Sequence, residues 1–396
     1  MKLDARVPLV TPFPTSEFHE RVERMREAMR FHELDAALLT SEANVEYLSG
    51  FWTLFAWNSL SRPWYFILPL DGEPIGVIPE FGETNWRNTS WVERLIVWPS
   101  PRPEDEGISL LAKIFRGLRH RFGRIGAELG AETRIGMPVN DFLRLRAEIQ
   151  PLQMVDATPT FRQVRQIKSP AEVARVAAIC RIAGEAFTTL PSYFIAGESE
   201  RALAQKFQAN LMLQGAEKTP YVAMSSGLNG YLSGSTWPSD RSIAEGDVLM
   251  IDTGSRLGGY FCDFNRNFAV APVSDEIRRT QAALVAAAAA GIDAARPGTT
   301  MSELFRVQLA LLETLGMTCG PVGRFGHGLG KLMTEWPSIK SDDHTVLTAG
   351  MIITIEPSVV LSNGRPMLHE EDIVITPDGC RVLTQRAGPD ITLLPI

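Results

Sequence analysis

The chain has 396 residues, 45% of them hydrophobic and 21% charged, which is the composition of folded globular domains rather than of a disordered chain. Its 39 basic and 46 acidic side chains give a formal net charge of -7, which argues against a protein that coats nucleic acid or an anionic membrane. At about 100–200 residues per domain, the length predicts two or three domains. The opening residues lack the apolar core of a signal peptide, and the most apolar stretch, residues 282–292, is too short to cross a bilayer. We therefore expect a cytoplasmic protein that binds neither nucleic acid nor membrane.

The first part of the chain predicts a sheet covered by helices. Residues 17–33 place apolar side chains among charges at helical spacing. Short apolar runs at 35–40, 65–72 and 95–98 predict strands, so this part is expected to be α/β. Tryptophans gather here, and they indicate either core and inter-domain packing or an aromatic wall at a substrate pocket or subunit interface. They are Trp52, Trp57, Trp64, Trp86, Trp91 and Trp98.

A second domain is expected to begin with a well-capped helix. Ser169 can cap the helix, Pro170 suits its first position, and Glu172 completes a capping box. The domain boundary is placed just before it, which gives domains over residues 1–165 and 166–396. The second domain alternates helices and strands without a regular βαβ order, which predicts an α+β domain with a mostly antiparallel sheet. The expected helices span 172–190, 198–214, 274–294 and 301–316, and the strands 247–252, 260–270, 351–356 and 372–376.

A metal site in this chain would depend on carboxylates, because there are only six histidines and the four cysteines form no CxxC pair. Asp252 ends an apolar strand, and a hairpin turning at 255–258 would bring Asp263 onto the neighbouring strand. Glu356 and Glu371 lie in similarly apolar segments. Burying each of these acids without a counter-charge would cost roughly several kcal/mol. Two divalent ions would neutralise all four, and such ions bind oxygen ligands well.

His327 is the candidate nitrogen ligand. It lies among glycines in the segment 324–330, where the backbone can approach a site closely. A histidine in this setting is by itself either a structural residue or a ligand. The chain order of the five residues is the stronger signal: Asp252, Asp263, His327, Glu356 and Glu371.

With this series the chain resembles the pita-bread metallopeptidases, which comprise aminopeptidase P, prolidase and methionine aminopeptidase, with their non-peptidase relative creatinase. Residues 34–50 resemble the N-terminal signature of the two-domain members, and residues 165–172 resemble the entry to their catalytic domain. The resemblance covers essentially the whole chain. It implies a creatinase-like α/β domain over 1–165, followed over 166–396 by a pita-bread catalytic domain whose curved, mostly antiparallel sheet is covered by helices.

The resemblance also implies a centre of two divalent ions. Asp252 would hold one ion, Asp263 and Glu371 would bridge both, and His327 and Glu356 would complete the second. Glu356 would accept and donate the proton as a water, activated by the ions, attacks a carbonyl. The mainly carboxylate set favours Mn²⁺, Fe²⁺ or Co²⁺, with Zn²⁺ as a further possibility. The complete set distinguishes this chain from creatinase, which has lost metal binding.

Three positions depart from the proline-directed members of the family. No histidine follows the segment 226–229, and Thr334 stands seven residues after His327, where those peptidases carry another histidine. His369 replaces the arginine of the RxED motif, either as a residue beside Glu371 or as a substitute that turns into the site. Threonine can donate a hydrogen bond but cannot carry a proton near neutral pH. The candidate catalytic residues are Glu356, His327, His369 and Thr334.

Aromatic side chains are the candidates for substrate binding. They could grip an apolar or cationic ligand, although packing is an equally adequate explanation. Two-domain members of the family usually form homodimers in which the first domain reaches the partner's active site. A homodimer is therefore expected, with residues near 52–64 contributing across the interface. The candidate substrate-binding residues are Tyr231, Trp237, Trp336 and Trp57.

Three functions remain open. The first is a dinuclear metal-dependent hydrolase of an amide bond that acts as an Xaa-Pro aminopeptidase or dipeptidase. The second keeps the metal centre but acts on a small non-peptide substrate, as in ectoine hydrolase, creatinase or dimethylsulfoniopropionate lyase. The third is a silent binding protein. The missing histidines favour the second on chemistry, and the intact ligand set argues against the third.

Overall fold

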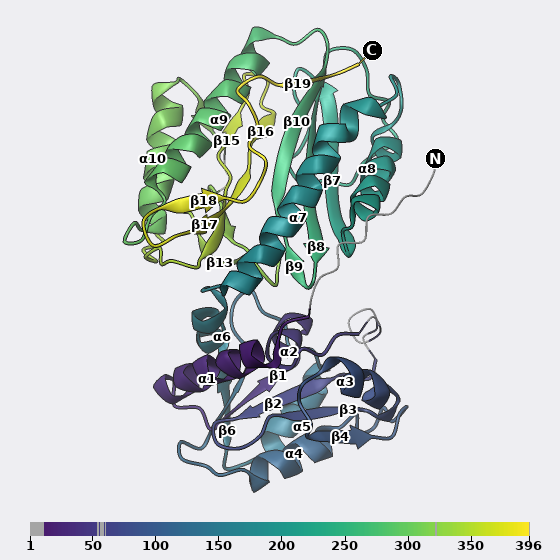
Figure 1. The fold of residues 1–396 in the computed structure, drawn as a ribbon, viewed down its shortest axis with the longest axis vertical. Helices are drawn as coiled ribbons and strands as arrows, with labels where there is room; N and C mark the ends of the chain where they lie inside the picture. Colours follow the sequence, from purple (N-terminus) through teal and green to yellow (C-terminus); the bar gives the residue numbers. More distant parts are fainter. Residues whose placement is uncertain (1–11, 54, 56–58, 60, 321–322, 396) are drawn as a thin grey trace. The chain divides into compact units, whose positions relative to one another are not determined.

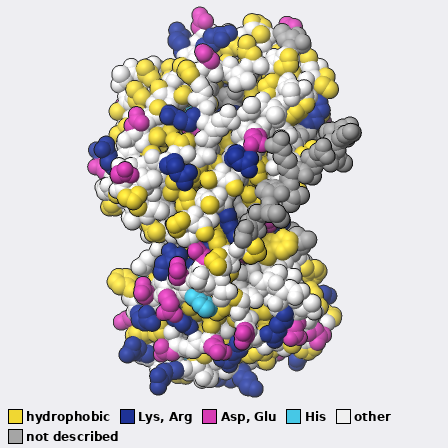
Figure 2. Space-filling model, viewed as in Figure 1, with side chains coloured by type: hydrophobic (Ala, Val, Ile, Leu, Met, Phe, Trp, Pro, Cys, Tyr) yellow, Lys and Arg dark blue, Asp and Glu magenta, His cyan; other side chains and the backbone are white. Residues whose placement is uncertain are grey.

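The computed structural model describes residues 12–53, 55, 59, 61–320 and 323–395. It divides into two compact units, Pro12–Arg165 and a second that begins at Gln166. Trp57, one of the candidate substrate-binding residues, lies outside the described residues. Figure 2 shows acidic and basic side chains interspersed over the visible face of each unit. None of the described helices is both long and apolar enough to cross a membrane.

The first unit is built on a six-stranded sheet of order β4-β3-β2-β1-β5-β6 (Figure 1). Leu38 and Leu39 on the central strand β1 point to opposite faces, and each is buried in a different hydrophobic cluster. Helices therefore cover both faces, which confirms the expected α/β arrangement. The strands are β1 Ala36–Leu39, β2 Tyr65–Pro69, β3 Ile75–Pro79, β4 Leu95–Trp98, β5 Arg124–Ala127 and β6 Gln153–Asp156. The helices are α1 Thr15–Phe31, α2 Glu42–Ser49, α3 Glu83–Thr89, α4 Ile108–Gly117, α5 Val139–Glu148 and α6 Thr158–Arg165.

The tryptophans of this unit serve mainly as core residues. Trp64, Trp86 and Trp98 are fully buried, whereas Trp52 and Trp91 are partly exposed. Phe51 stacks against both Trp64 and Trp86, with ring centroids 5.0 Å and 4.8 Å apart. Packing, the first of the two interpretations of the cluster, therefore accounts for the three buried rings.

The second unit opens with the predicted helix. The Ser169 hydroxyl accepts a hydrogen bond from the backbone NH of Glu172, and the Glu172 side chain accepts one from the NH of Ser169, so the capping box is confirmed. In Figure 1, α7 runs along one side of β10 and β8, with α8 beside it, while α9 and α10 cover the other half. The helices are α7 Pro170–Thr189, α8 Glu200–Gln214, α9 Asp275–Ala294 and α10 Met301–Thr314.

The strands of this unit form sheets that are antiparallel except where β10 pairs with β19. The expected α+β architecture with a mostly antiparallel sheet is thus confirmed. One sheet has the order β19-β10-β8-β7 and another the order β13-β12-β14-β17-β18. The strands are β7 Lys218–Leu228, β8 Asp247–Leu257, β9 Tyr260–Phe261, β10 Phe264–Val270, β11 Thr318–Cys319, β12 His327–Gly328, β13 Glu335–Ser338, β14 Ile352–Ile355, β15 Ser358–Val360, β16 Pro366–Leu368, β17 Glu371–Ile375, β18 Cys380–Val382 and β19 Thr392–Leu394.

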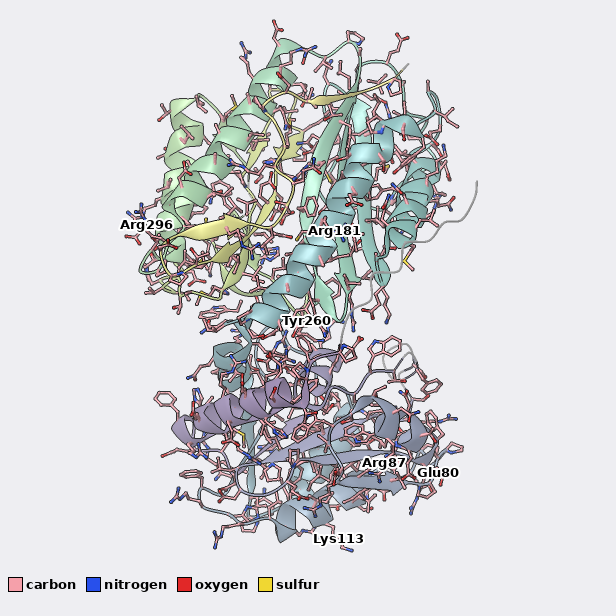
Figure 3. The ribbon with its side chains drawn as sticks, in the orientation of Figure 1. Glu80, Arg87, Lys113, Arg181, Tyr260 and Arg296 are labelled. Carbon is pink, nitrogen blue, oxygen red and sulfur yellow. The ribbon has the colours of Figure 1, made fainter. Side chains whose placement is uncertain are left out.

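The expected hairpin is present, but it turns two residues later than predicted. Strand β8 continues to Leu257, and the chain reverses at Gly258 and Gly259, whose φ angles of 55° and 79° favour glycine. The predicted strand 260–270 is interrupted between β9 and β10, and Asp263 occupies that interruption. Figure 3 shows Tyr260 at the end of the sheet nearest the first turn of α7, where its hydroxyl donates a 2.7 Å hydrogen bond to Glu172.

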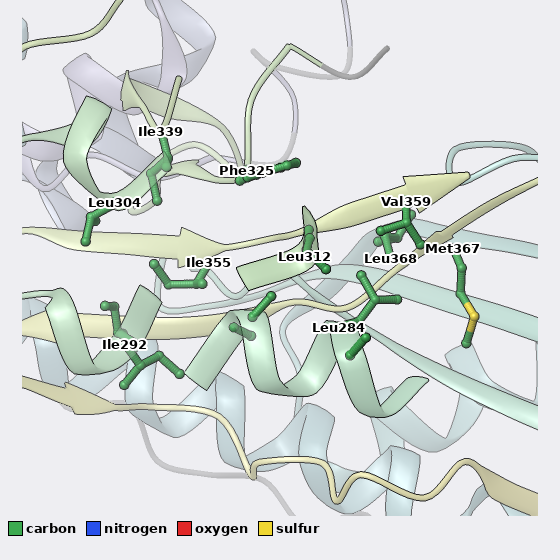
Figure 4. Close-up of a cluster of buried hydrophobic side chains, with 14 of the residues drawn as sticks. Leu284, Ile292, Leu304, Leu312, Phe325, Ile339, Ile355, Val359, Met367 and Leu368 are labelled. Atoms are coloured by element: carbon green, nitrogen blue, oxygen red, sulfur yellow. The ribbon is translucent and has the colours of Figure 1, made fainter. Parts of the chain in front are cut away.

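The apolar faces of α9 and α10 pack against β14, β15 and β16 to form the core of this half (Figure 4). Leu284 on α9 is fully buried in that cluster. We expect Leu284→Ala to lower the free energy of unfolding by about 2–5 kcal/mol, because the lost contacts leave a cavity. Urea unfolding followed by circular dichroism measures the change. Leu315→Ala, at a 44% exposed position, is the matched control, and equal losses in the two variants would contradict the assignment of this core.

Candidate metal centre

The candidate metal ligands of the second unit lie on several different strands and in the turns beside them. Asp252 lies within β8, and Asp263 lies in the interruption between β9 and β10. His327 begins β12, and Glu356 directly follows β14. Glu370 directly precedes β17. All are buried except Glu356, which is partly exposed.

Three of these side chains converge closely enough to hold one ion. Ligand atoms of Asp263, His327 and Glu370 all lie within 4.8 Å of one another. The His327 Nε2 atom is 3.5 Å from Asp263 Oδ2. His327 Nδ1 is 2.9 Å from the carbonyl oxygen of Gly328. A proton on Nδ1 satisfies that carbonyl and leaves the Nε2 lone pair facing the carboxylate of Asp263, which is the tautomer that a metal ligand needs.

Glu370, and not Glu371, takes the place that the sequence assigned to the bridging glutamate. Glu371 accepts hydrogen bonds from Arg266 (3.0 Å), His369 Nε2 (3.1 Å), the backbone NH of Ala387 (3.2 Å) and the hydroxyl of Thr384. Burial raises its pKa, but Arg266 and the other donors outweigh that effect and lower the pKa to about 2. Both oxygens of Glu371 are thus committed on the side of Arg266. Neighbouring residues of an extended chain point to opposite sides, so Glu370 faces the cluster instead.

In the absence of a counter-charge, burial and mutual repulsion disfavour the ionised forms of the acids in this cluster. Burial, and then the charge of Glu356, raises the pKa of Asp252 to about 7. Burial also raises the pKa of Glu356 to about 7. The pKa values of Asp263 and Glu370 are raised well above their usual range, by burial and then by the neighbouring carboxylates. Burial, and then Arg324, lowers the pKa of His327 to about 4, so the imidazole stays neutral and available as a ligand.

Unpartnered oxygen atoms provide the test of whether the cluster fits a divalent ion. Asp252 Oδ1 and Glu370 Oε1 are buried and have no hydrogen-bond partner among the described residues. A buried carboxylate oxygen without a donor is costly, and a hard divalent cation would satisfy it. The donor set of carboxylate oxygens and one imidazole suits Mn²⁺, Fe²⁺, Co²⁺ or Zn²⁺. The residues therefore fit the metal that the carboxylate pattern predicts.

Two backbone features hold the ligands in place. Gly326 has φ of 133°, and a Cβ atom there would overlap the carbonyl oxygen of Thr354, so only glycine allows this approach to β14. The backbone NH of His327 then bonds the Thr354 hydroxyl at 3.2 Å. Asp372 anchors Asp263, because its Oδ2 atom accepts a 3.1 Å hydrogen bond from the Asp263 backbone NH. Sequence reasoning missed Asp372, although it directly follows the two glutamates.

Neither His369 nor Thr334 faces the cluster in the way that a replacement for a missing histidine would. His369 is buried, but its Nε2 atom bonds Glu371, so it lies beside Glu371, the first of its two interpretations. Thr334 is exposed.

The three aromatic candidates that the structure describes lie in different environments. Tyr231 is fully buried in the hydrophobic core, and its hydroxyl accepts a 2.7 Å hydrogen bond from the backbone NH of Leu368. It is therefore a core residue, because a ring enclosed on all sides cannot contact substrate. Trp237 is 78% exposed, and Trp336 is half-buried on β13.

Tyr221 is a residue of this site that sequence reasoning missed. It lies on β7 opposite Gly254, two positions from the pair formed by Ala223 and Asp252. Its hydroxyl donates a hydrogen bond to Ser235 Oγ at 3.2 Å. The alternation of β7 could have indicated Tyr221 once the pairing of β7 with β8 was known, but the sequence alone does not give that register.

Comparisons with known proteins agree with this architecture. The family model of the creatinase/prolidase N-terminal domain matches residues 21–167. An Xaa-Pro dipeptidase of Pyrococcus horikoshii is 26% identical over 93% of this chain and 97% of its own length. A probable dipeptidase PepE of Mycobacterium tuberculosis is 24% identical over 83% of this chain and 85% of its own length.

Solved structures show the same fold over nearly the whole chain. Dipeptidase PepE from Mycobacterium ulcerans superposes with a TM-score of 0.82 at 23% identity and covers 98% of this chain and 100% of its own. A prolidase from Thermococcus sibiricus gives a TM-score of 0.84 at 24% identity over 95% of this chain and 99% of its own. The N-terminal domain of the FACT complex subunit SPT16 from chickpea gives 0.74 at 15% identity, covering 96% of this chain and 100% of its own.

The family model of metallopeptidase family M24 matches residues 174–377, which span the complete cluster of buried acids and His327. The converging ligand atoms, the buried unpartnered oxygens and this match agree with one another. The chain is a metal-dependent hydrolase that belongs to metallopeptidase family M24, with the two-domain pita-bread architecture.

Proposed function

We propose that this protein hydrolyses the amide bond before proline in dipeptides or short peptides. The observation that carries the proposal is the convergence of Asp263, His327 and Glu370 in a buried cluster whose ligand atoms lie close enough to hold an ion. Relatives named as Xaa-Pro dipeptidases match this chain over almost its entire length, which supports the same type of substrate here.

We further propose that two divalent ions bind at this cluster, with Mn²⁺, Fe²⁺ or Co²⁺ as the native metal. Asp252 would serve one ion, and Glu356 and His327 the other. Asp263 and Glu370 would be further ligands of this centre. Bound ions of this kind polarise a carbonyl and make a hydroxide nucleophile available near neutral pH.

Glu356 and His327 would have different roles in the reaction. Glu356, a carboxylate at the edge of the cluster, would take a proton from the attacking water and return it to the leaving nitrogen. Its partial exposure leaves it accessible to substrate, unlike the fully enclosed Asp372. The neutral imidazole of His327 serves as a ligand rather than as an acid, because its pKa is lowered to about 4.

A second candidate function is the hydrolysis of a small non-peptide amide by the same centre. The positions of Thr334 and His369 favour it: the first is exposed, and the second is bonded to Glu371 instead of facing the cluster. Ectoine hydrolase and creatinase are examples of enzymes that act on small non-peptide substrates. The third hypothesis is a binding protein without catalytic activity. It gives no reason for the buried oxygens of Asp252 and Glu370 that lack a hydrogen-bond partner.

Metal content per chain is the first test. Protein purified without chelators or an immobilised-metal column is expected to contain close to two ions per chain by elemental analysis. The loaded protein is then assayed with Ala-Pro, with tripeptides that contain Xaa-Pro, and with small cyclic amides. Cleavage of Ala-Pro would support the proposal, and turnover of cyclic amides alone would select the second function. Protein that binds no metal after incubation with Mn²⁺ or Co²⁺ would overturn both.

We also propose a homodimer, as the resemblance to two-domain pita-bread enzymes implies. Gel filtration with light scattering is expected to give twice the mass of one chain. A monomer at all concentrations would contradict this proposal and would leave the metal centre unaffected.

A further inference from the structure

Tyr221 shares a face of the sheet with the candidate metal ligand Asp252. On the antiparallel pair β7 and β8, Ala223 lies opposite Asp252 and Tyr221 lies opposite Gly254. Residues directly opposite one another, and those two positions along, project from the same face. The ring of Tyr221 therefore projects on the side of Asp252, at the diagonal position within reach of a long side chain.

The Tyr221 hydroxyl lies beside the cluster. Its single proton can be donated to Ser235 Oγ, 3.2 Å away, or to the carboxylate of Asp252, where that hydrogen bond partly offsets the rise in the pKa of Asp252. Burial, followed by the charges of Asp252, Asp263 and Glu370, raises the pKa of Tyr221. Tyr221 is half-buried, so the hydroxyl is held in place without being sealed from a ligand.

Tyr221 and Ser235 meet where the chain lacks a histidine. Ser235 lies in the loop after residues 226–229, the segment after which the proline-directed peptidases that this chain resembles carry a catalytic imidazole. The resemblance implies that this imidazole helps to bind the substrate and to stabilise the developing oxyanion. A phenol can donate a hydrogen bond to such an oxyanion, although it cannot carry a positive charge.

We propose that Tyr221 is the hydrogen-bond donor that stabilises the negative charge developing on the carbonyl oxygen of the scissile amide. This inference rests on the proposed function. During attack a bond forms between the water oxygen and the carbonyl carbon, and then the C–N bond breaks. The nitrogen takes the proton that Glu356 received from the water, and Tyr221 keeps its own proton throughout. Its hydroxyl only turns from Ser235 towards the substrate oxygen.

A different role for Tyr221 would be to position Asp252 for metal binding. The two roles predict different effects of Tyr221→Phe. Loss of an oxyanion donor lowers kcat and leaves metal affinity intact, because that bond forms fully only as negative charge develops. Loss of a positioning group weakens metal affinity and lowers kcat as a consequence. Ser235→Ala is the matched control, because it removes the partner of the hydroxyl but leaves the hydroxyl itself.

Three measurements decide between them: Mn²⁺ affinity of the metal-free protein by calorimetry, the Kd of a phosphinate analogue of Ala-Pro, and kcat and KM for Ala-Pro. For Tyr221→Phe we expect kcat to fall by about 10²–10³-fold, phosphinate binding to weaken strongly, and Mn²⁺ affinity and KM to change by less than about threefold. Ser235→Ala, which keeps the Tyr221 hydroxyl, should lower kcat and phosphinate affinity much less than Tyr221→Phe does.

An unchanged kcat and phosphinate Kd in Tyr221→Phe would overturn the oxyanion role while leaving the proposed hydrolase intact. Mn²⁺ affinity that falls in parallel with kcat would also overturn it, and would assign Tyr221 to positioning. A metal-loaded wild type that hydrolyses neither Ala-Pro nor the longer peptides would overturn the proposed function together with this inference.

Discussion

Glu370→Gln and Glu371→Gln, which change adjacent residues in the same way, are expected to have opposite effects. Glu370 is a buried carboxylate with an unpartnered oxygen among other acids. Replacing it with a neutral amide removes repulsion, so the metal-free protein should become more stable. The same change removes a proposed metal ligand, so the metal content should fall from two ions per chain to one or none and hydrolysis should be lost.

Glu371→Gln acts through the ion pair with Arg266. The Arg266 side chain is 10% exposed and that of Glu371 is 1% exposed, and their closest atoms are 3.0 Å apart. Removing one charge of a buried pair leaves the other uncompensated, which costs about 3–5 kcal/mol. We therefore expect Glu371→Gln to unfold at markedly lower urea concentration, while the folded fraction retains its metal.

Urea unfolding of the metal-free forms and elemental analysis of the metal-loaded forms measure the two effects separately. If Glu371→Gln lost the metal and Glu370→Gln retained it, the assignment of the ligand would be reversed in favour of Glu371, the residue that the sequence motif indicated. Because the two variants differ by one position and carry the same chemical change, a general effect of altering this strand cannot explain opposite outcomes.

The choice between these two glutamates marks how far the sequence could be taken. The order of acids and His327 along the chain indicated the family, the two-domain architecture and the carboxylate-rich centre. The segment around Glu371 carries two adjacent glutamates and an aspartate, so the motif allowed two alignments one residue apart. A shift of one residue moves a side chain to the opposite face of a strand.

Cross-strand pairing resolves that ambiguity, and it is a long-range property. Ile353 pairs with Ile373 and Ile355 pairs with Glu371, and the three isoleucines all lie in the hydrophobic core. Glu371 therefore lies on the side of the core, where Arg266 meets it. The residues after Asp372 are uniformly apolar, so they show no alternation of polar and apolar side chains that would indicate which face of the strand Glu371 occupies. The burial of Tyr231 and the position of Tyr221 likewise depend on packing that local sequence patterns do not specify.

The metal-free protein should lose stability as the pH rises from about 4 to about 7. Asp252 and Glu356 have pKa values raised to about 7 in the folded state, against ordinary values near 4 in the unfolded chain. Between these values the folded state binds more protons than the unfolded state, so the free energy of unfolding falls with increasing pH. Glu371 acts in the opposite sense, since its pKa of about 2 contributes stability that is lost only as the pH falls below about 4. His327, whose pKa is lowered to about 4, opposes the trend below about pH 6.5, but the two carboxylates outweigh the one imidazole. Stability of the metal-free form should therefore be greatest near pH 4–5.

Divalent ions should reverse this trend, because they bind the deprotonated carboxylates and compete with protons. When the pKa of a group differs by one between the folded and unfolded states, the free energy of unfolding changes by about 1.4 kcal/mol. The resulting loss of stability should lower the Tm of the metal-free form by roughly 5–10 °C between pH 5 and pH 7.5. The Tm increase caused by saturating Mn²⁺ should grow over the same interval. Calorimetric scans at several pH values, with and without Mn²⁺, measure both trends, and Glu370→Gln should show a shallower slope and little response to Mn²⁺. A metal-free Tm that rises steadily from pH 5 to pH 7.5 would mean that these carboxylates are already ionised and stabilised by the protein itself. The buried cluster would then have no need of a cation, and the physical argument for a metal centre at this place would fail.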